Sequence, residues 1–126
     1  MNFQWFHEKP KEVIVTLASG NITLNKQAST YFEHAYNVML GVDELTHKIA
    51  IKPLSKEESM SKAIPDNKKY KITIRSSYAR ITNKAFMEEI MNLSGLNLLD
   101  ESVKYPAVWD NKEQILIVDL KGGNIK

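Results

Sequence analysis

The feature that most constrains the fold of this chain is an apparent repeat. Residues 13–54 are predicted to form a strand, a turn, a second strand, a short amphipathic helix and two further strands, and residues 72–120 follow the same order. A duplicated unit of roughly fifty residues usually builds two lobes around one core, because neither lobe can bury its apolar face alone. The alternative is an α+β domain whose halves merely share an order of elements.

Length and composition favour one domain. The chain has 126 residues, of which 43% are hydrophobic, and it has no cysteine, so disulfides and thiolate zinc sites are excluded. A reducing compartment is the simplest fit, and no apolar run is long enough for a membrane helix, which predicts a cytoplasmic protein without a membrane partner. We expect one domain over residues 1–126, with halves 11–54 and 70–121 joined by a polar linker, 55–69.

Local signals place the elements of each half. In the first half, Ser19-Gly20-Asn21 predicts a hairpin turn, Asn25 is suited to cap a helix of about ten residues, and residues 37–42 and 48–54 are predicted to form a second hairpin. In the second half, Asn83 is the expected cap and Gly95 the expected end of the helix. Residues 96–106 form a join that is about eight residues longer than its counterpart, before a closing hairpin around Asp110.

Three short motifs carry a resemblance to a known family: Gly20-Asn21-Ile22-Thr23-Leu24-Asn25-Lys26, Tyr78-Ala79-Arg80-Ile81-Thr82-Asn83-Lys84 and Ile49-Ala50-Ile51-Lys52-Pro53. They resemble the AbrB-like, swapped-hairpin transcription factors, a group that includes MazE-type antitoxins and MraZ regulators. Asn replaces the Pro of that pattern in both copies, its Arg after Gly is kept only as Arg80, and neither predicted helix carries the further Arg of many members. The resemblance implies a β-rich α+β fold in which two β-α-β-β halves close as a small pseudo-symmetric barrel, and a role in transcription regulation.

One basic stretch is the candidate nucleic-acid site. Residues 67–87 contain no acidic residue, whereas the net charge of the whole chain is only +2. Lysine and arginine on one strand face can neutralise phosphates, and Arg80 can also reach a base edge, so duplex DNA is the expected partner. The alternative is a solvated outer strand whose lysines protect a sheet edge. The predicted contacts are Lys69, Lys71, Arg75, Arg80 and Lys84.

Three aromatic residues near the start of the chain, Phe3, Trp5 and Phe6, form the second candidate site. Packing on the core is the favoured interpretation, and contact with a protein partner or a second copy is the alternative. If nucleic-acid binding is absent, the alternative function is a non-enzymatic protein-interaction or oligomerisation module on the same scaffold, with these aromatic residues in its interface.

No catalytic constellation stands out. The three histidines occur singly, so neither a metal site nor a cofactor is expected. Asp43, Glu44 and His47 share a predicted hairpin tip, but exposed turns commonly carry such residues without chemistry. We therefore expect a protein that is not an enzyme and has no small-molecule substrate.

Overall fold

The computed structural model describes residues 1–8, 11–122 and 124–125. The first half contains β1 (Ile14–Leu17), β2 (Asn21–Leu24), α1 (Lys26–Ser29), the 3₁₀ turn η1 (Thr30–Phe32), β3 (Asn37–Asp43) and β4 (Lys48–Leu54). Between the halves lie α2 (Lys56–Met60) and the 3₁₀ turn η2 (Asp66–Lys68). The second half contains β5 (Thr73–Ile74), β6 (Ala79–Thr82), α3 (Lys84–Ser94), β7 (Val103–Asp110), β8 (Ile115–Asp119), η3 (Leu120–Gly122) and β9 (Asn124–Ile125).

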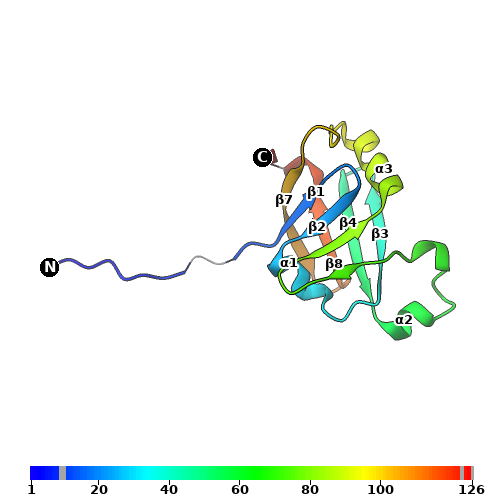
Figure 1. Cartoon of the computed structure of the whole chain (residues 1–126), viewed down its shortest axis with the longest axis horizontal. Coiled ribbons are helices and arrows are strands. Elements are labelled where there is room, and N and C mark those ends of the chain that lie inside the picture. The colour runs from blue at the N-terminus through cyan, green and yellow to red at the C-terminus, as the bar shows by residue number, and fades with distance from the viewer. Residues whose placement is uncertain (9–10, 123, 126) are drawn as a thin grey trace.

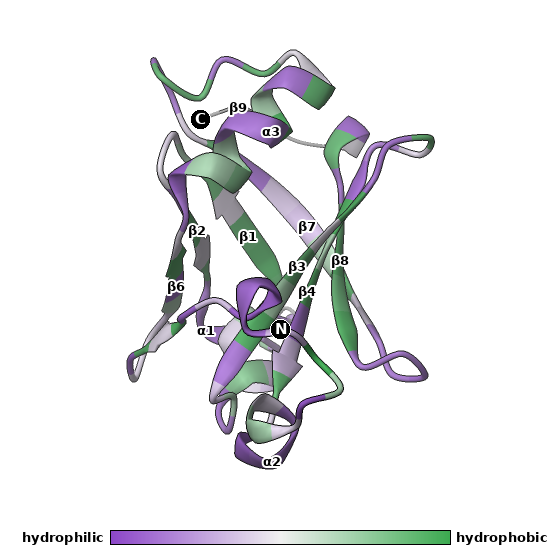
Figure 2. Ribbon diagram, turned by 90° about the vertical axis from the view of Figure 1, so that its right-hand side faces the viewer, coloured by the Kyte–Doolittle hydropathy of each residue, from purple (hydrophilic) through white to green (hydrophobic). Residues whose placement is uncertain are grey.

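The strands form one antiparallel sheet that curls into a half-barrel. Its order is β3-β4-β8-β7-β1-β2-β6-β5, and β9 pairs with the start of β7. Curling brings β3 beside the segment that precedes β5, where Val38 and Tyr70 form a single bridge. Figure 2 shows the curled sheet with α3 at one end and α2 at the other. The small β-rich α+β fold expected from the sequence is confirmed.

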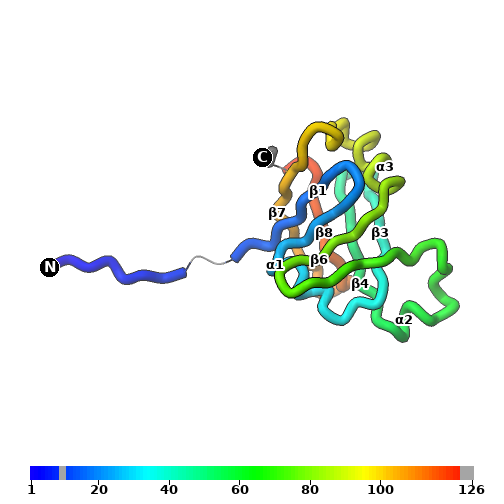
Figure 3. Tube along the Cα trace, viewed as in Figure 1, coloured from blue at the N-terminus to red at the C-terminus, as the bar shows by residue number. Residues whose placement is uncertain are grey.

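Strands of the two halves lie beside one another throughout the sheet (Figure 3). β1 pairs with β7, β2 with β6 and β4 with β8. Ile22 of the first half lies directly opposite Ile81 of the second, and Ala50 lies opposite Ile117. The halves therefore share one interior instead of forming separate cores.

Side-chain alternation along the strands fills that interior. Val15 and Leu17 of β1, Leu24 of β2 and Ile81 of β6 are 0% exposed, while the residues between them face outward. α3 closes one end of the half-barrel with its buried apolar side, formed by Phe86, Met87 and Ile90. Within the described residues, no helix is long and apolar enough to cross a membrane.

Both expected helix caps are present. Asn25 Oδ1 accepts a hydrogen bond from Ala28 N at 2.9 Å, and Asn83 Oδ1 accepts one from Phe86 N at 2.9 Å. Gly95 ends α3 in the left-handed conformation, with φ 76°. The first helix is shorter than predicted, because α1 passes into η1 after four residues. Tyr31, in η1, is 38% exposed and stacks on Trp109, with ring centroids 4.5 Å apart.

The two long hairpins, β3–β4 and β7–β8, are built alike. Adding 67 to the residue numbers of a pair in the β3–β4 hairpin gives a pair of the β7–β8 hairpin, wherever both hairpins are paired. Gly41↔Ala50, for example, corresponds to Val108↔Ile117. At the tips, Asp43 Oδ1 accepts hydrogen bonds from Leu45 N and Thr46 N, and Asp110 Oδ1 accepts them from Lys112 N and Glu113 N. His47 (φ 56°) and Gln114 (φ 57°) then turn each chain through the left-handed region.

Two segments hold more structure than the sequence indicated. The predicted linker contains α2, whose Ser55 side chain accepts from Glu58 N while Glu58 Oε1 accepts from Ser55 N, a complete capping box. β7 begins at Val103, inside the segment predicted to be a join. Val103 and Tyr105 alternate inward there, and a period of two over so few residues is hard to recognise beside Pro106.

The favoured interpretation of the N-terminal aromatics as core residues is wrong. Phe3, Trp5 and Phe6 are 69%, 85% and 88% exposed. Residues 1–8 contain no helix or strand and extend away from the half-barrel (Figure 1). The interior is already filled by side chains from the strands and α3, so no position in it remains for these rings.

Candidate functional site

The outer side of the sheet formed by β7, β1, β2, β6 and β5 carries a polar and basic surface, which we call the basic face. Register places one row of directly opposed residues across all five strands: Lys104, Thr16, Thr23, Arg80 and Thr73. Neither β1, β2, β5 nor β6 contains an acidic residue. The opposed row therefore presents cations and hydroxyl groups with no carboxylate among its members.

Arg80 lies between Thr23 and Thr73 in this row. Its Nε donates a hydrogen bond to Thr23 Oγ1 at 3.3 Å, and its guanidinium carbon lies 5.2 Å from the centroid of the Tyr78 ring. The two contacts restrict the side chain while its terminal nitrogens stay on the exposed side of the sheet. An arginine held in this way is suited to bind a phosphate or the acceptor edge of a base.

The structure brings together some of the residues predicted to contact nucleic acid. Lys71 and Arg75 are exposed on either side of Thr73, whose neighbour across the hairpin is Arg80, and Lys84 is exposed at the first position of α3. Lys104 joins the same row and was not predicted. The sequence feature that marks Lys104 as outward-facing is its position between the inward residues Val103 and Tyr105. This feature can be recognised only when the start of β7 at Val103 is known.

Lys69 has a different environment from the other predicted contacts. Its side chain is only 8% exposed, and its Nζ donates to the Ser59 carbonyl oxygen, to Ser61 O at 3.3 Å and to Asp66 Oδ1 at 3.1 Å. These bonds hold α2 and η2 against each other. The ammonium group of Lys69 is therefore engaged inside the segment between the halves.

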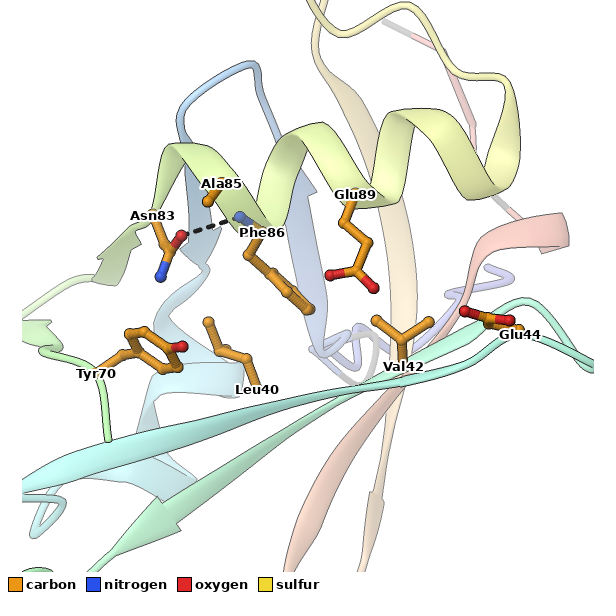
Figure 4. A pocket seen from close by; sticks show the side chains of 8 residues that line it. All are labelled: Leu40, Val42, Glu44, Tyr70, Asn83, Ala85, Phe86 and Glu89. Atoms are coloured by element: carbon orange, nitrogen blue, oxygen red, sulfur yellow. Dashed lines mark hydrogen bonds between the residues drawn. The ribbon is translucent and has the colours of Figure 1, made fainter. Parts of the chain in front are cut away.

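A pocket of about 430 Å³ lies between α3 and β3 (Figure 4). Its apolar wall is formed by Leu40 and Val42 from β3 and Phe86 from α3. The carboxylates of Glu89 and Glu44 line it as well, and no lysine, arginine or histidine does. The remaining lining residues are Tyr70, Asn83 and Ala85.

The two halves meet along two contacts at the ends of their sheets, and the pocket lies beside the contact that is less complete. β1 and β7 pair over four residues, from Ile14↔Pro106 to Leu17↔Val103, and we call this contact the closed seam. Among the described residues, the one backbone bridge from β3 to the second half joins Val38 and Tyr70, which exchange two hydrogen bonds of 2.9 Å, and we call this contact the open seam. Beyond that bridge β3 runs beneath α3 with β4 on one side and, among the described residues, no paired strand on the other.

Among the described residues, no three histidine, aspartate or glutamate side chains gather in a geometry that could hold a metal ion. Comparison of the chain with known protein families, with curated proteins and with solved structures finds no match.

Proposed function

We propose that this protein binds duplex DNA through the basic face and acts as a regulator of the AbrB-like kind. The observation that carries the proposal is the acid-free row across five strands, in which Arg80 lies between Thr23 and Thr73. Phosphate contacts by lysine and arginine release condensed counterions and supply most of the affinity for DNA. Lys71, Arg75, Lys84 and Lys104 are the proposed backbone contacts, and Arg80 is the proposed central contact.

We also propose that the two halves arose by duplication and form a pseudo-symmetric barrel. The constant shift of 67 residues between the two long hairpins supports this, as does the like construction of their tips. An antiparallel pair has a local twofold axis, and the pairs Ile22↔Ile81 and Ala50↔Ile117 would lie on that axis. Such an arrangement is expected for the swapped-hairpin family that the motifs resemble.

The test is a titration of a fluorescein-labelled duplex of mixed sequence with the full chain. We expect binding that weakens steeply between about 50 and about 200 mM salt. Arg80→Ala should remove most of the affinity, and Lys104→Ala should weaken binding and lower the salt slope by about 1. Lys112→Ala is the matched control, because Lys112 is exposed at the β7–β8 tip, outside the basic face.

The variant Lys69→Ala tests whether Lys69 stabilises the fold or contacts DNA. We propose that it serves the fold, so Lys69→Ala should lower stability and leave the salt slope unchanged. An absence of binding at low salt, or equal losses for Arg80→Ala and Lys112→Ala, would overturn the DNA proposal.

The exposure of Phe3, Trp5 and Phe6 favours a second candidate function, an interaction or oligomerisation module. Large aromatic side chains contribute strongly to protein interfaces, and three of them on one exposed arm are unusual without a partner. Sedimentation of the wild type and of Trp5→Ala tests this function. A self-associated wild type whose association is weakened by Trp5→Ala would support it, and a monomeric wild type would exclude the self-association form.

A further inference from the structure

The edge of β3 at the open seam has backbone groups that point away from β4. Val38 uses both its N–H and its C=O to bond Tyr70, and the residue opposite it on β4 is Pro53, which has no N–H. Because backbone direction alternates along a strand, the N–H and C=O groups of Leu40 and Val42 point to the same side as those of Val38. Within the described residues, these four groups have no backbone partner on that side.

The closed seam shows how such an edge is completed. Tyr105 and Ala107 lie 67 residues after Val38 and Leu40, at the same places of the like-built hairpin. Tyr105 pairs with Val15, and Ala107 N donates to Val13 O at 2.9 Å. The edge of this hairpin therefore accepts an added strand in one half of the molecule, while the same edge of the other half is vacant beyond Val38.

The pocket beside the vacant edge selects the side chain of an added strand. Its wall of Leu40, Val42 and Phe86 suits an aliphatic stem, and the Glu44 and Glu89 carboxylates suit a positive charge at the end of that stem. No basic side chain of the chain itself lines the pocket to neutralise these carboxylates. Lysine and arginine combine the two properties.

We propose that an extended peptide segment of a partner protein adds to the β3 edge beneath α3. Its backbone would bond the N–H and C=O groups of Leu40 and Val42, and a lysine or arginine of the segment would enter the pocket toward Glu44 and Glu89. This is recognition by strand addition, in which main-chain bonds supply affinity and a pocket supplies specificity. The proposal uses Leu40, Val42, Glu44 and Glu89, none of which is a proposed DNA contact, so it does not rest on DNA binding.

The experiment is a titration of the isotope-labelled full chain with the peptide acetyl-Val-Thr-Lys-Val-Thr-Val-amide, followed by NMR. We expect saturable shifts of the Leu40 and Val42 amide signals. Replacing the peptide lysine by glutamate, or Glu89→Lys in the protein, should each weaken binding by about tenfold or more, because a charge-assisted contact is lost. Glu89 is exposed, so the variant should fold, and the dispersion of its spectrum checks this.

Two further arms test the strand geometry. The same peptide with N-methylated backbone amides keeps its lysine but loses its donors, and it should bind at least about tenfold more weakly. Glu113→Lys, a matched charge reversal at the β7–β8 tip, should leave the peptide affinity unchanged. Absence of shifts at Leu40 and Val42, or undiminished binding of the N-methylated peptide, would overturn the proposal. So would equal effects of Glu89→Lys and Glu113→Lys.

Discussion

The closed and the open seam join equivalent parts of the two halves, but only the closed seam is a continuous piece of sheet. Four residue pairs connect β1 to β7, and Tyr105 at their centre is fully buried. One bridge connects β3 to the second half, and Tyr70 at that bridge is half-buried. The difference arises because the chain before β5 turns away through η2, whereas the chain before β1 continues along β7 as far as Val13.

Under the proposed strand addition, one hairpin design would serve stability in one half and binding in the other. A completed edge buries its backbone groups and contributes to the core. An incomplete edge is an aggregation hazard unless it is short, and this one is short, because its outward backbone groups beyond Val38 belong to Leu40 and Val42. We therefore expect substitutions at the closed seam to affect folding more than equivalent substitutions at the open seam.

The largest expected contrast is between the two seam tyrosines. Tyr105→Ala should cost about 3–5 kcal/mol of unfolding free energy, because it empties a fully buried position opposite Val15. Tyr70→Ala should cost only about 1 kcal/mol, since Tyr70 is half-buried and its hydroxyl bonds Asn67 O at 3.2 Å near the surface. Urea unfolding of both variants measures the contrast, and equal losses would contradict the distinction between the seams.

The two helix caps should also differ. Asn25→Ala should cost about 2 kcal/mol, because Asn25 caps α1, accepts Ile14 N at 3.1 Å and donates to Glu12 O at 2.8 Å. Asn83→Ala should cost about 1 kcal/mol, since within the described residues its side chain bonds only Phe86 N. Thermal unfolding of the two variants compares them. If Asn83→Ala lost more stability than Asn25→Ala, the bonds from Asn25 to Ile14 and Glu12 would not anchor β1.

The hydroxyl of Tyr105 should reduce stability. Among the described residues it is a buried oxygen atom without a hydrogen-bond partner, so Tyr105→Phe should raise the unfolding free energy by about 1 kcal/mol. Burial raises the pKa of Tyr105. The folded state therefore favours the neutral phenol, and the wild type should lose stability as the pH rises above about 10, where the unfolded chain ionises.

Unfolding of Tyr105→Phe at neutral and alkaline pH tests this expectation, with Tyr70→Phe as the control. The unfolding free energy of Tyr105→Phe should fall less between neutral and alkaline pH than that of the wild type, because the variant has no phenol at this position to ionise. Tyr70→Phe should give no gain, because the hydroxyl of Tyr70 has a partner. A destabilised Tyr105→Phe would show that the hydroxyl is satisfied.

The smallest effects are expected at the two hairpin tips. His47→Gly and Gln114→Gly should each stabilise the protein by about 0.5 kcal/mol, because glycine relieves a left-handed strain that exceeds its own entropic cost. The two gains should be alike, since the tips are built alike. Thermal unfolding measures both, and a gain at one tip with a loss at the other would break the equivalence of the hairpins.

Much of the fold followed from local sequence signals. Asn25, Asn83 and Gly95 mark helix ends through bonds that span only a few residues, and the strands 37–42 and 48–54 have long apolar runs. The capping box of α2 was equally local, in Ser55 and Glu58, but the polar composition around it favoured a linker. The exposure of Phe3, Trp5 and Phe6 was not the favoured interpretation, because hydrophobicity alone does not tell a core residue from an interface residue.

The candidate sites depended on information that no local window of the sequence holds. The basic stretch around Arg80 is visible in the sequence, but the surroundings of Lys69 and Lys104 are not, since they depend on the fold of the segment between the halves and on strand register. The pocket depends on which edge of the sheet stays incomplete.

The sequence by itself determined the order of the elements, their caps and the alternation that sends apolar side chains inward, because these depend on interactions between residues close in the chain. Tertiary structure alone decided that the halves pair strand by strand, that Lys104 joins Arg80 in one row, and that β3 keeps an open edge beneath α3. Strand pairing sums many weak contacts between distant segments, so the partner of each edge is settled only when the whole sheet has curled.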